Sequence, residues 1–382
     1  MIVIKSKRVW DGENFIPDSL FIEDGKIVDR KGYDVEADID YEDYMIWPGF
    51  IDIHTHGGFG TDIMVTDAEG IRTWVKEVTK LGTTSLLATT FTDSHDNQVK
   101  AINNVVEVMK NGYTGAEILG LNYEGPYLNK EYAGGMPEQY IVEPNVEEYD
   151  EFYKLAEGHL KVMSIAVEKD KDFQFTDHVS DSGVIVSAGH TNATFQDIEM
   201  ARSHGLKNMT HTYNCMSPLH HRKPGCIGAA YLFDDLYTEL ICDGSMVSVE
   251  ACKVLFKMKP QDKVVMITDS LACQGFTTPG YQFDCGGFWG EVLEDGSVVE
   301  VGTGMFLGST LGMNSIVKTA VKRCGVDYKT AVCASSLNAA TLLNIADHKG
   351  KLEKGYDADI VVINDDYDVI QTYCLGKKMI GE

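Results

Sequence analysis

The chain has few positive charges, and it lacks long apolar runs and cysteine pairs in C-x-x-C spacing. With 33 Lys and Arg against 58 Asp and Glu its net charge is −25, and so acidic a protein repels nucleic acids and anionic membranes. No apolar run could span a bilayer, and residues 1–11 lack the apolar region of a secretory signal. We therefore expect a cytoplasmic protein that binds neither nucleic acid nor membrane.

The cysteines also exclude two classes of protein. There are nine of them, an odd number, and all lie in the second half of the chain. A disulfide framework or a zinc ribbon needs paired cysteines at short spacing. The expected state is therefore a set of reduced thiols.

The two ends of the chain have a similar sequence pattern, with short apolar runs that predict strands; near the N-terminus Asp-Gly turns separate them. A chain of 382 residues suits one large catalytic domain and one smaller domain. We expect residues 1–47 and 346–382 to form a small β-sandwich domain. A hairpin at about 281–301 is expected to join it.

The middle of the chain, residues 48–345, alternates apolar strand candidates with helical patterns. Eight candidates follow one another: the run that ends at His54, and residues 85–88, 118–121, 162–167, 183–187, 207–210, 240–242 and 264–267. Eight βα units predict a (β/α)8 TIM-like barrel. A doubly wound open sheet is the alternative.

Polar side chains stand at the ends of five of these strands. Because residues i and i+2 of a strand share a face, His54 and His56 can present two imidazoles to one point. The other strand ends carry Glu124, His190, His211 and Asp269. In a barrel these ends meet on one rim, where active sites lie, and imidazole and carboxylate together bind divalent metals.

Each residue taken singly has an ordinary structural explanation. His54 and His56 could lie in an exposed turn, and His190 and His211 could be core histidines bonded to backbone. Glu124, in Glu-Gly-Pro, could belong to a turn, and Asp269 could cap a helix. The joint occurrence at strand ends favours the metal site.

Several motifs resemble the amidohydrolase superfamily: residues 48–57, the later histidines, Asp269 and residues 355–362. Residues 124–129, 189–194, 211–216 and 222–225 are similar to the N-acetylglucosamine-6-phosphate deacetylase family. The resemblance implies that Glu124, His190 and His211 hold the principal metal. His54 and His56 would hold a second ion where that site is occupied, and Asp269 would be the catalytic acid and base.

The resemblance also implies the substrate contacts and the assembly. An amino-sugar phosphate would be bound by Gly135, Asn214, Cys215 (through its backbone), Arg222, Met246, Phe306 and Leu307. Arg222 lies in a compact basic stretch, residues 220–223, which could instead be a solvated loop. In the family this arginine reaches the neighbouring subunit's site, which implies a homodimer. One or two divalent ions per subunit are expected, zinc or iron first, with manganese, cobalt or nickel as alternatives.

Two positions depart from the family pattern. Met246 stands where the family commonly has a histidine, and Met136 where it often has His or Gln. Thioether sulfur replaces hydrogen-bonding groups poorly. The two methionines reflect tolerated variation, a local misalignment with the family pattern, or a shifted substrate, such as a differently substituted or non-phosphorylated amino sugar.

Two rival functions remain open. A cyclic amidohydrolase would bridge two metals with a modified lysine at the end of strand four, where the residue to inspect is Lys169. A sugar-phosphate sensor would keep the metal shell but would have no need of Asp269 as a proton carrier.

Overall fold

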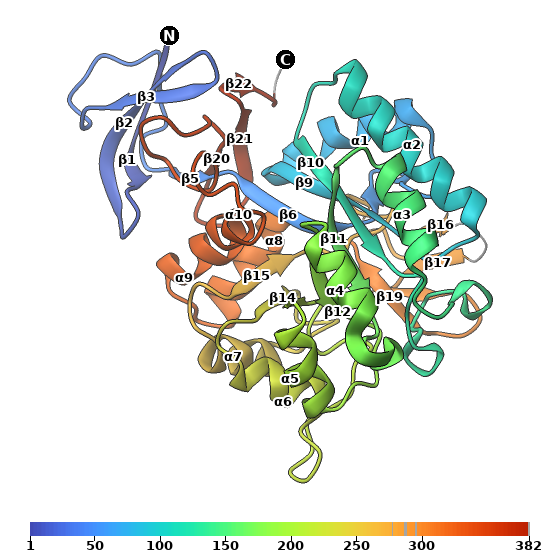
Figure 1. Cartoon of the computed structure of the whole chain (residues 1–382). Coiled ribbons are helices and arrows are strands. Elements are labelled where there is room, and N and C mark those ends of the chain that lie inside the picture. The colour runs from blue at the N-terminus through green and yellow to red at the C-terminus, as the bar shows by residue number, and fades with distance from the viewer. Residues whose placement is uncertain (277, 286–288, 295, 381–382) are drawn as a thin grey trace.

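The computed structural model describes residues 1–380 except 277, 286–288 and 295. Its centre is an eight-stranded parallel sheet rolled into a barrel, with helices around it (Figure 1). In chain order the strands are β6 Phe50–Thr55, β9 Thr83–Thr90, β10 Glu117–Glu124, β11 Leu160–Ile165, β12 Ile185–Ala188, β13 Leu206–Met209, β14 Tyr237–Ile241 and β15 Val264–Ile267. The strands pair in this order, which confirms the predicted barrel.

Hydrogen bonds beyond the strand ends close the barrel between β6 and β15. The amide of Asp269 donates to the carbonyl of His54 (2.9 Å), and the amide of His56 donates to the carbonyl of Ser270 (2.8 Å). Below them the hydroxyl of Thr268 donates to the carboxylate of buried Asp52 (2.6 Å). Closure therefore fixes two strand ends that carry predicted site residues against each other.

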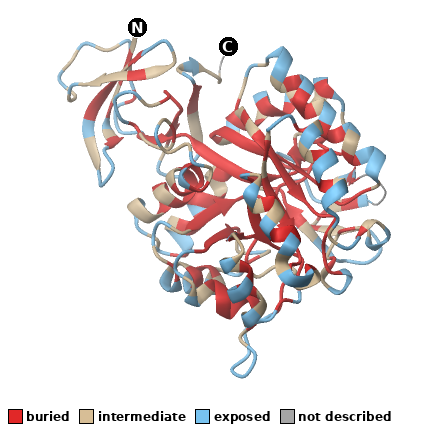
Figure 2. Ribbon diagram, viewed as in Figure 1, coloured by how far each residue is buried: buried red, intermediate tan, exposed pale blue. Residues whose placement is uncertain are grey.

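Most residues of the barrel strands are buried, and Figure 2 draws these strands largely in red beneath the surrounding helices. The covering helices are α1 Ala68–Glu77, α2 His95–Asn111, α3 Val146–Leu155, α4 Gln174–Asp181, α5 Phe195–Ser203, α6 Gly225–Leu232 and α7 Val249–Met258. Burial on both faces explains why most of these strands read as continuous apolar runs rather than alternating ones.

Two longer helical stretches follow the last barrel strand. α8 (Met313–Lys318) continues into the π-helical turn η6 (Thr319–Arg323). α9 (Tyr328–Val332) continues through the π-helical turn η7 (Cys333–Leu337) into α10 (Asn338–Leu342). Short 3₁₀ turns lie at η1 Val78–Leu81, η2 Lys130–Tyr132, η3 Glu138–Tyr140, η4 Val167–Lys169 and η5 Lys171–Phe173.

Both ends of the chain meet in one mixed sheet beside the barrel (Figure 1). Its strands are β1 Ile2–Trp10, β2 Phe15–Glu23, β3 Lys26–Arg30, β4 Ile39–Asp40, β5 Met45–Pro48, β20 Ile360–Ile363, β21 Val369–Cys374 and β22 Lys377–Lys378. The antiparallel pair β5–β20 joins the N-terminal to the C-terminal strands. The small β domain predicted from the two termini is therefore present, with its strands bonded into a single sheet.

A buried lysine links this sheet to the barrel. Lys349 Nζ lies 2.7 Å from Glu117 of β10, 3.0 Å from Asp357 and 2.6 Å from Asp359. Burial alone would lower the pKa of Lys349, but the carboxylates hold it well above its ordinary value. The lysine therefore stays charged and neutralises acids from both parts of the chain.

The expectation for residues 281–301 is wrong in one respect. Their strands form a separate antiparallel sheet on the far side of the barrel from the two termini: β16 Gln282–Asp284, β17 Trp289–Val292, β18 Ser297–Glu300 and β19 Phe306–Ser309 (Figure 1). β19 docks on the end of the last barrel strand, where the amide of Ser309 donates to the carbonyl of Asp269 (3.0 Å). Hairpin pairing is local and readable in sequence, but the surface on which a hairpin docks is not.

A two-stranded ribbon, β7 Gly57–Gly58 and β8 Thr61–Asp62, follows the first barrel strand. Among the helices described, none is both long and apolar enough to cross a membrane.

Candidate metal centre

Six donor side chains gather at the carboxyl rim of the barrel. Each lies within a barrel strand or at most two residues beyond its end: His54, His56, Glu124, His190, His211 and Asp269. All six are buried. The barrel topology alone brings together residues that lie far apart in sequence.

Three of these residues have left-handed backbone, with φ of 47° at His190, 28° at His211 and 47° at Asp269. Such a conformation costs a residue with a side chain about 1–3 kcal/mol, and it persists only where surrounding structure enforces it. Here it reverses the chain just past the strand end. The imidazoles and the carboxylate can then reach the centre of the rim.

Glu124 Oε1 is the centre of the first group of donors. It lies 2.8 Å from His211 Nε2 and 3.1 Å from His190 Nε2, and the two imidazole nitrogens are 3.1 Å apart. Three donor atoms that converge so closely can share one cation.

The second group adjoins the first through the same carboxylate. His56 Nε2 lies 3.2 Å from Glu124 Oε2 and 3.2 Å from Asp269 Oδ1. His54 Nε2 lies 3.5 Å from Glu124 Oε1 and 3.6 Å from Asp269 Oδ1. Glu124 therefore stands between two potential ion positions, and Asp269 lies beside the second.

The electrostatics of the cluster favour positive charge at its centre. Burial opposes the charge of Glu124, but the charge of His54 and hydrogen bonds with His190 and His211 hold its pKa well below its ordinary value. Burial likewise opposes a charged His56, yet Asp269 and Glu124 raise its pKa to about 9. A divalent cation supplies this positive charge without protons on the imidazoles.

Neighbouring groups fix which imidazole nitrogens face the cluster. His190 Nδ1 donates to the carbonyl of Tyr132 (2.9 Å), which can only accept, so Nε2 is left as the ligand atom. His54 Nδ1 contacts Glu239 Oε2 at 2.9 Å. His54 Nε2 is buried and finds no hydrogen-bond partner among the described residues. These oriented lone pairs and the carboxylate fit a divalent metal ion.

A cavity of about 200 Å³ opens over the cluster. Six residues predicted to contact substrate line its walls: Gly135, Asn214, Cys215, Met246, Phe306 and Leu307. Met136 also lines it, so both methionine departures face the same space. A Cβ on Gly135 would lie 2.7 Å from Leu307 Cδ2, so the leucine side chain would have to shift to accept it.

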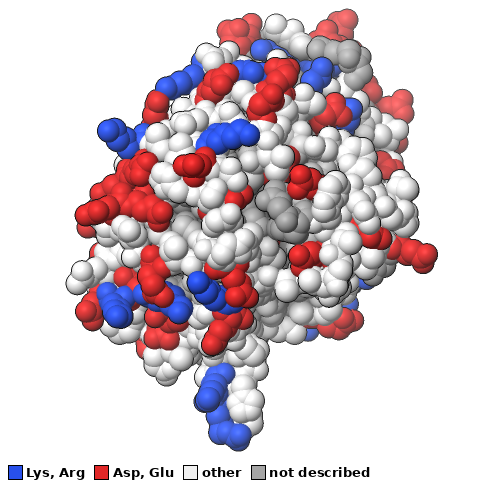
Figure 3. All heavy atoms as spheres, turned by 90° about the vertical axis from the view of Figure 1, so that its right-hand side faces the viewer, with Lys and Arg blue, Asp and Glu red and all other residues white. Residues whose placement is uncertain are grey.

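Arg222 lies elsewhere, on an exposed hairpin closed by hydrogen bonds between His220 and Lys223 (3.1 and 2.9 Å). The hairpin projects from the body of the molecule before α6 (Figure 1), and Figure 3 shows its basic tip. Leu219 beside it is 53% exposed. The structure therefore separates Arg222 from the cavity of its own subunit.

Glu239 and Asp62 also belong to the site, although neither was predicted from the sequence. Glu239 is fully buried in β14, where it contacts His54 Nδ1 and accepts from the amide of His211 (3.0 Å). A glutamate inside an apolar strand was the signal that could have identified it. Asp62 lines the cavity, and burial raises its pKa to about 6.

Residues 281–309 supply part of the cavity wall as well. Cys285 follows β16 and Met305 precedes β19, and both line the cavity. Since the hairpin was expected to join the terminal sheet, these two contacts were not foreseen.

Lys169, the residue to inspect for a cyclic amidohydrolase, lies in η4 on the outer surface. Its Nζ is 3.8 Å from Glu143, and it borders two surface hollows rather than the metal cavity. A carboxylated lysine at this position would not reach the histidine cluster.

The model of the amidohydrolase family matches residues 45–379, so the chain belongs to the amidohydrolase family. An N-acetylglucosamine-6-phosphate deacetylase of Bacillus subtilis is 36% identical over 337 residues, which cover 87% of this chain and 84% of the relative. An N-acetylgalactosamine-6-phosphate deacetylase of Escherichia coli O157:H7 is 30% identical over 98% of both chains.

Solved structures agree with the fold. The crystal structure of an N-acetylglucosamine-6-phosphate deacetylase from Thermotoga maritima superposes with a TM-score of 0.88 at 29% identity, with 100% of each chain covered.

Substitution of Glu239 by Gln should weaken metal binding by about 10- to 100-fold without unfolding the protein, because this carboxylate orients one imidazole and anchors a second. Competition with a chelator measures the affinity. The exposed Glu199 of α5 provides a matched control, and Glu199→Gln should bind metal like the wild type. Equal affinities for the two variants would mean that Glu239 has no part in the centre.

Proposed function

We propose that the chain is a metal-dependent deacetylase that hydrolyses the acetamide of N-acetylglucosamine 6-phosphate to glucosamine 6-phosphate and acetate. The convergence of Glu124 Oε1 with His190 and His211 within 3.1 Å, beside Asp269 and under the cavity, carries the proposal. The named activity of the Bacillus subtilis relative supports the choice of sugar.

In this proposal Glu124, His190 and His211 hold the principal ion, and His54 and His56 hold a second one where that position is filled. Zinc or iron is the first choice, because imidazole suits both, and manganese, cobalt or nickel could replace them. A bound divalent ion supplies Lewis-acid chemistry, by which it polarises a carbonyl and makes water a stronger acid.

The chain's own residues supply the proton transfers. Asp269 is ionised at neutral pH: burial opposes its charge, but His56 and His54 hold its pKa below the ordinary value. It can therefore take a proton from the attacking water. The protonated carboxyl then gives that proton to the amide nitrogen, which leaves as an amine because it cannot leave as an anion. The cavity walls would hold the acetyl group beside the Asp269 carboxylate.

We infer that the sugar ring lies against Gly135, Met246, Phe306 and Leu307, with Asn214 and the backbone of Cys215 as polar contacts. The phosphate would be bound by Arg222 of a second subunit, because a guanidinium grips phosphate through two hydrogen bonds. The projecting hairpin has a basic tip and an exposed Leu219 beside it, and both are suited to contact a second subunit. A homodimer with shared sites follows from this proposal.

A related N-acetylated amino sugar is the second candidate. The Escherichia coli relative is named for N-acetylgalactosamine 6-phosphate, although its identity of 30% is close to that of several glucosamine-type relatives. Met136 and Met246 both line the cavity, where hydrogen-bonding groups would discriminate between sugars. Because their sulfur atoms are weak hydrogen-bond acceptors, other residues must determine which sugar epimer the enzyme prefers and whether it requires the phosphate.

Acetate release separates these candidates, and Asp269→Asn tests the mechanism. The zinc- or iron-loaded enzyme should release acetate from N-acetylglucosamine 6-phosphate faster than from the galactose epimer or the free sugar. Asp269→Asn should lower turnover by about 10²- to 10⁴-fold, because it removes the proton carrier. It should keep the principal ion, because Glu124, His190 and His211 are unchanged. The control is Asp262→Asn, whose side chain is 72% exposed. More than a tenth of wild-type activity in Asp269→Asn would contradict the assigned role.

Met246→His tests whether this methionine shapes substrate preference. Imidazole would restore a hydrogen-bonding group in the cavity, so kcat/KM for phosphorylated relative to free sugar should rise by about tenfold, the worth of one hydrogen bond to a charged group. Met200→His on the exposed face of α5 is the matched control and should leave the ratio unchanged. An unchanged ratio in both variants would assign the preference elsewhere.

Arg222→Ala should lower kcat/KM for the phosphorylated sugar by about 10- to 100-fold through loss of charge-assisted hydrogen bonds, and should leave the free sugar unaffected. Arg72→Ala on α1 controls for loss of a surface charge. Mixing the Arg222→Ala and Asp269→Asn proteins should restore activity, because one site of each mixed dimer then has both residues. A monomeric mass by light scattering, or no recovery on mixing, would exclude the shared site.

A further inference from the structure

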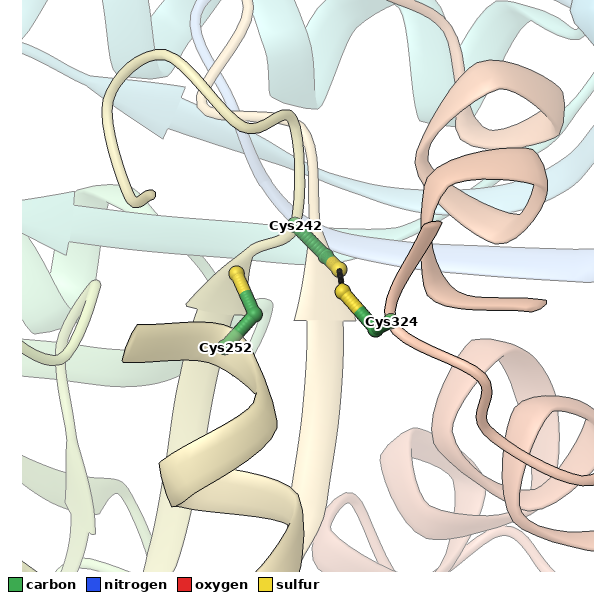
Figure 4. A group of neighbouring side chains, drawn as sticks. All are labelled: Cys242, Cys252 and Cys324. Atoms are coloured by element: carbon green, nitrogen blue, oxygen red, sulfur yellow. Dashed lines mark hydrogen bonds between the residues drawn. The ribbon is translucent and has the colours of Figure 1, made fainter. Parts of the chain in front are cut away.

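Three cysteines from separate elements meet in the core, away from the histidine cluster. Cys242 directly follows β14, Cys252 lies in α7, and Cys324 directly follows η6. In Figure 4 a dashed line joins the sulfur atoms of Cys242 and Cys324, and the Cys252 sulfur lies to one side of them. Their sulfur atoms all lie within 4.8 Å of one another, and Cys242 Sγ is 3.8 Å from Cys324 Sγ.

The cysteines are buried, and all three thiols are free. A single buried thiol is usually a small apolar core residue. Convergence of three is different, because each sulfur then faces two others. Among the described residues, two weak contacts to backbone carbonyls accompany them: Cys252 Sγ to Val247 (3.6 Å) and Cys324 Sγ to Val249 (3.8 Å). Apolar packing of cysteine side chains does not require three sulfur atoms to converge at one point.

Two basic residues adjoin the trio in sequence. Lys253 follows Cys252, and Arg323 precedes Cys324. The charges of both residues favour negative charge on the Cys324 sulfur.

The separations also match a shared ion. Thiolates bound tetrahedrally to zinc at about 2.3 Å lie about 3.8 Å apart, and trigonal binding places them about 4 Å apart. The Cys242–Cys324 distance already equals the first value. Cys252 needs a shift of less than about 1 Å, which a rotation of its side chain can supply.

We propose that Cys242, Cys252 and Cys324 form a second metal site, which takes a soft, thiophilic ion such as Zn²⁺ or Cu⁺. Thiolate ligands favour such ions over hard cations such as Mg²⁺ and Ca²⁺. Each thiol that binds releases its proton to solvent and donates a sulfur electron pair, so no oxidant or reductant is involved. Three thiolates on Zn²⁺ leave one negative charge, which Lys253 and Arg323 offset.

The position of the site indicates what the ion would do. Asp243 follows Cys242 directly, and residues 243–246 lead to Met246 in the cavity wall. Arg323, next to Cys324, donates to the carbonyl of Asp243 (3.4 Å). An ion here would tie the end of β14 to α7 and η6, and so hold the loop that carries Met246. Its role is structural, and it is independent of whether the deacetylase proposal holds.

Cadmium tests the site directly, because only thiolate ligands produce its ultraviolet sulfur-to-metal charge-transfer band. The reduced, metal-free full chain should develop this band with one equivalent of Cd²⁺ bound at the trio, and its thermal midpoint should rise. Cys324→Ser should weaken this binding by at least about tenfold, the least that loss of a ligand costs. Cys333→Ser, half-buried in η7, is the matched control and should bind like the wild type.

Cys215→Ser separates the trio from the catalytic cavity, since Cys215 lines that cavity. The band should survive this change; loss of the band in Cys215→Ser would place the sulfur in the cavity and overturn the proposal. Should Cys324→Ser fail to fold, X-ray absorption of the cadmium-loaded wild type decides without any variant. About three sulfur neighbours support the site, whereas a shell of nitrogen and oxygen alone, or no charge-transfer band, overturns it.

Discussion

The placement of the Glu124 carboxylate among four imidazoles is the constraint on which the rest of the site depends. One oxygen faces His190 and His211, and the other faces His56. A carboxylate buried so deeply stays ionised only if positive charge surrounds it, and imidazoles or cations must supply that charge. Two features hold the imidazoles close to Glu124. The backbone is left-handed just past three strand ends, and the Glu239 carboxylate contacts His54.

Much of this arrangement could be predicted from the sequence, because a barrel converts order along the chain into position on a rim. Seven of the eight barrel strands could be predicted from their apolar residues. The strand β13, Leu206–Met209, has poor propensity, but His211 after it repeated the pattern of the other strand ends. Periodicity and chain order therefore sufficed to place six donors, although they could not show which imidazole nitrogen faces the centre.

What the sequence could not predict depends on tertiary docking. The hairpin β17–β18 follows from local pairing. Its place beside Asp269 depends on the bridge between Ser270 and Ser309 and on an apolar cluster that includes Leu271 and Val298. The sequence alone does not explain a glutamate in the apolar strand β14, because the partner of Glu239, His54, comes from a distant strand. The cysteine trio has no motif spacing at all, since its members come from three elements that only the closed barrel brings together.

The two groups of donors differ in chemistry and in access. The histidine and carboxylate cluster lies at the mouth of a cavity, where water and substrate can enter, and its donors suit several divalent ions. The thiols of the trio lie in the core, and thiolate favours softer ions. Sulfur is not confined to the core, because the cavity is also lined by Met136, Cys215, Met246, Cys285 and Met305. Neither of these two cysteines belongs to a described group of donors that could share an ion, so the donors at the rim are imidazole and carboxylate.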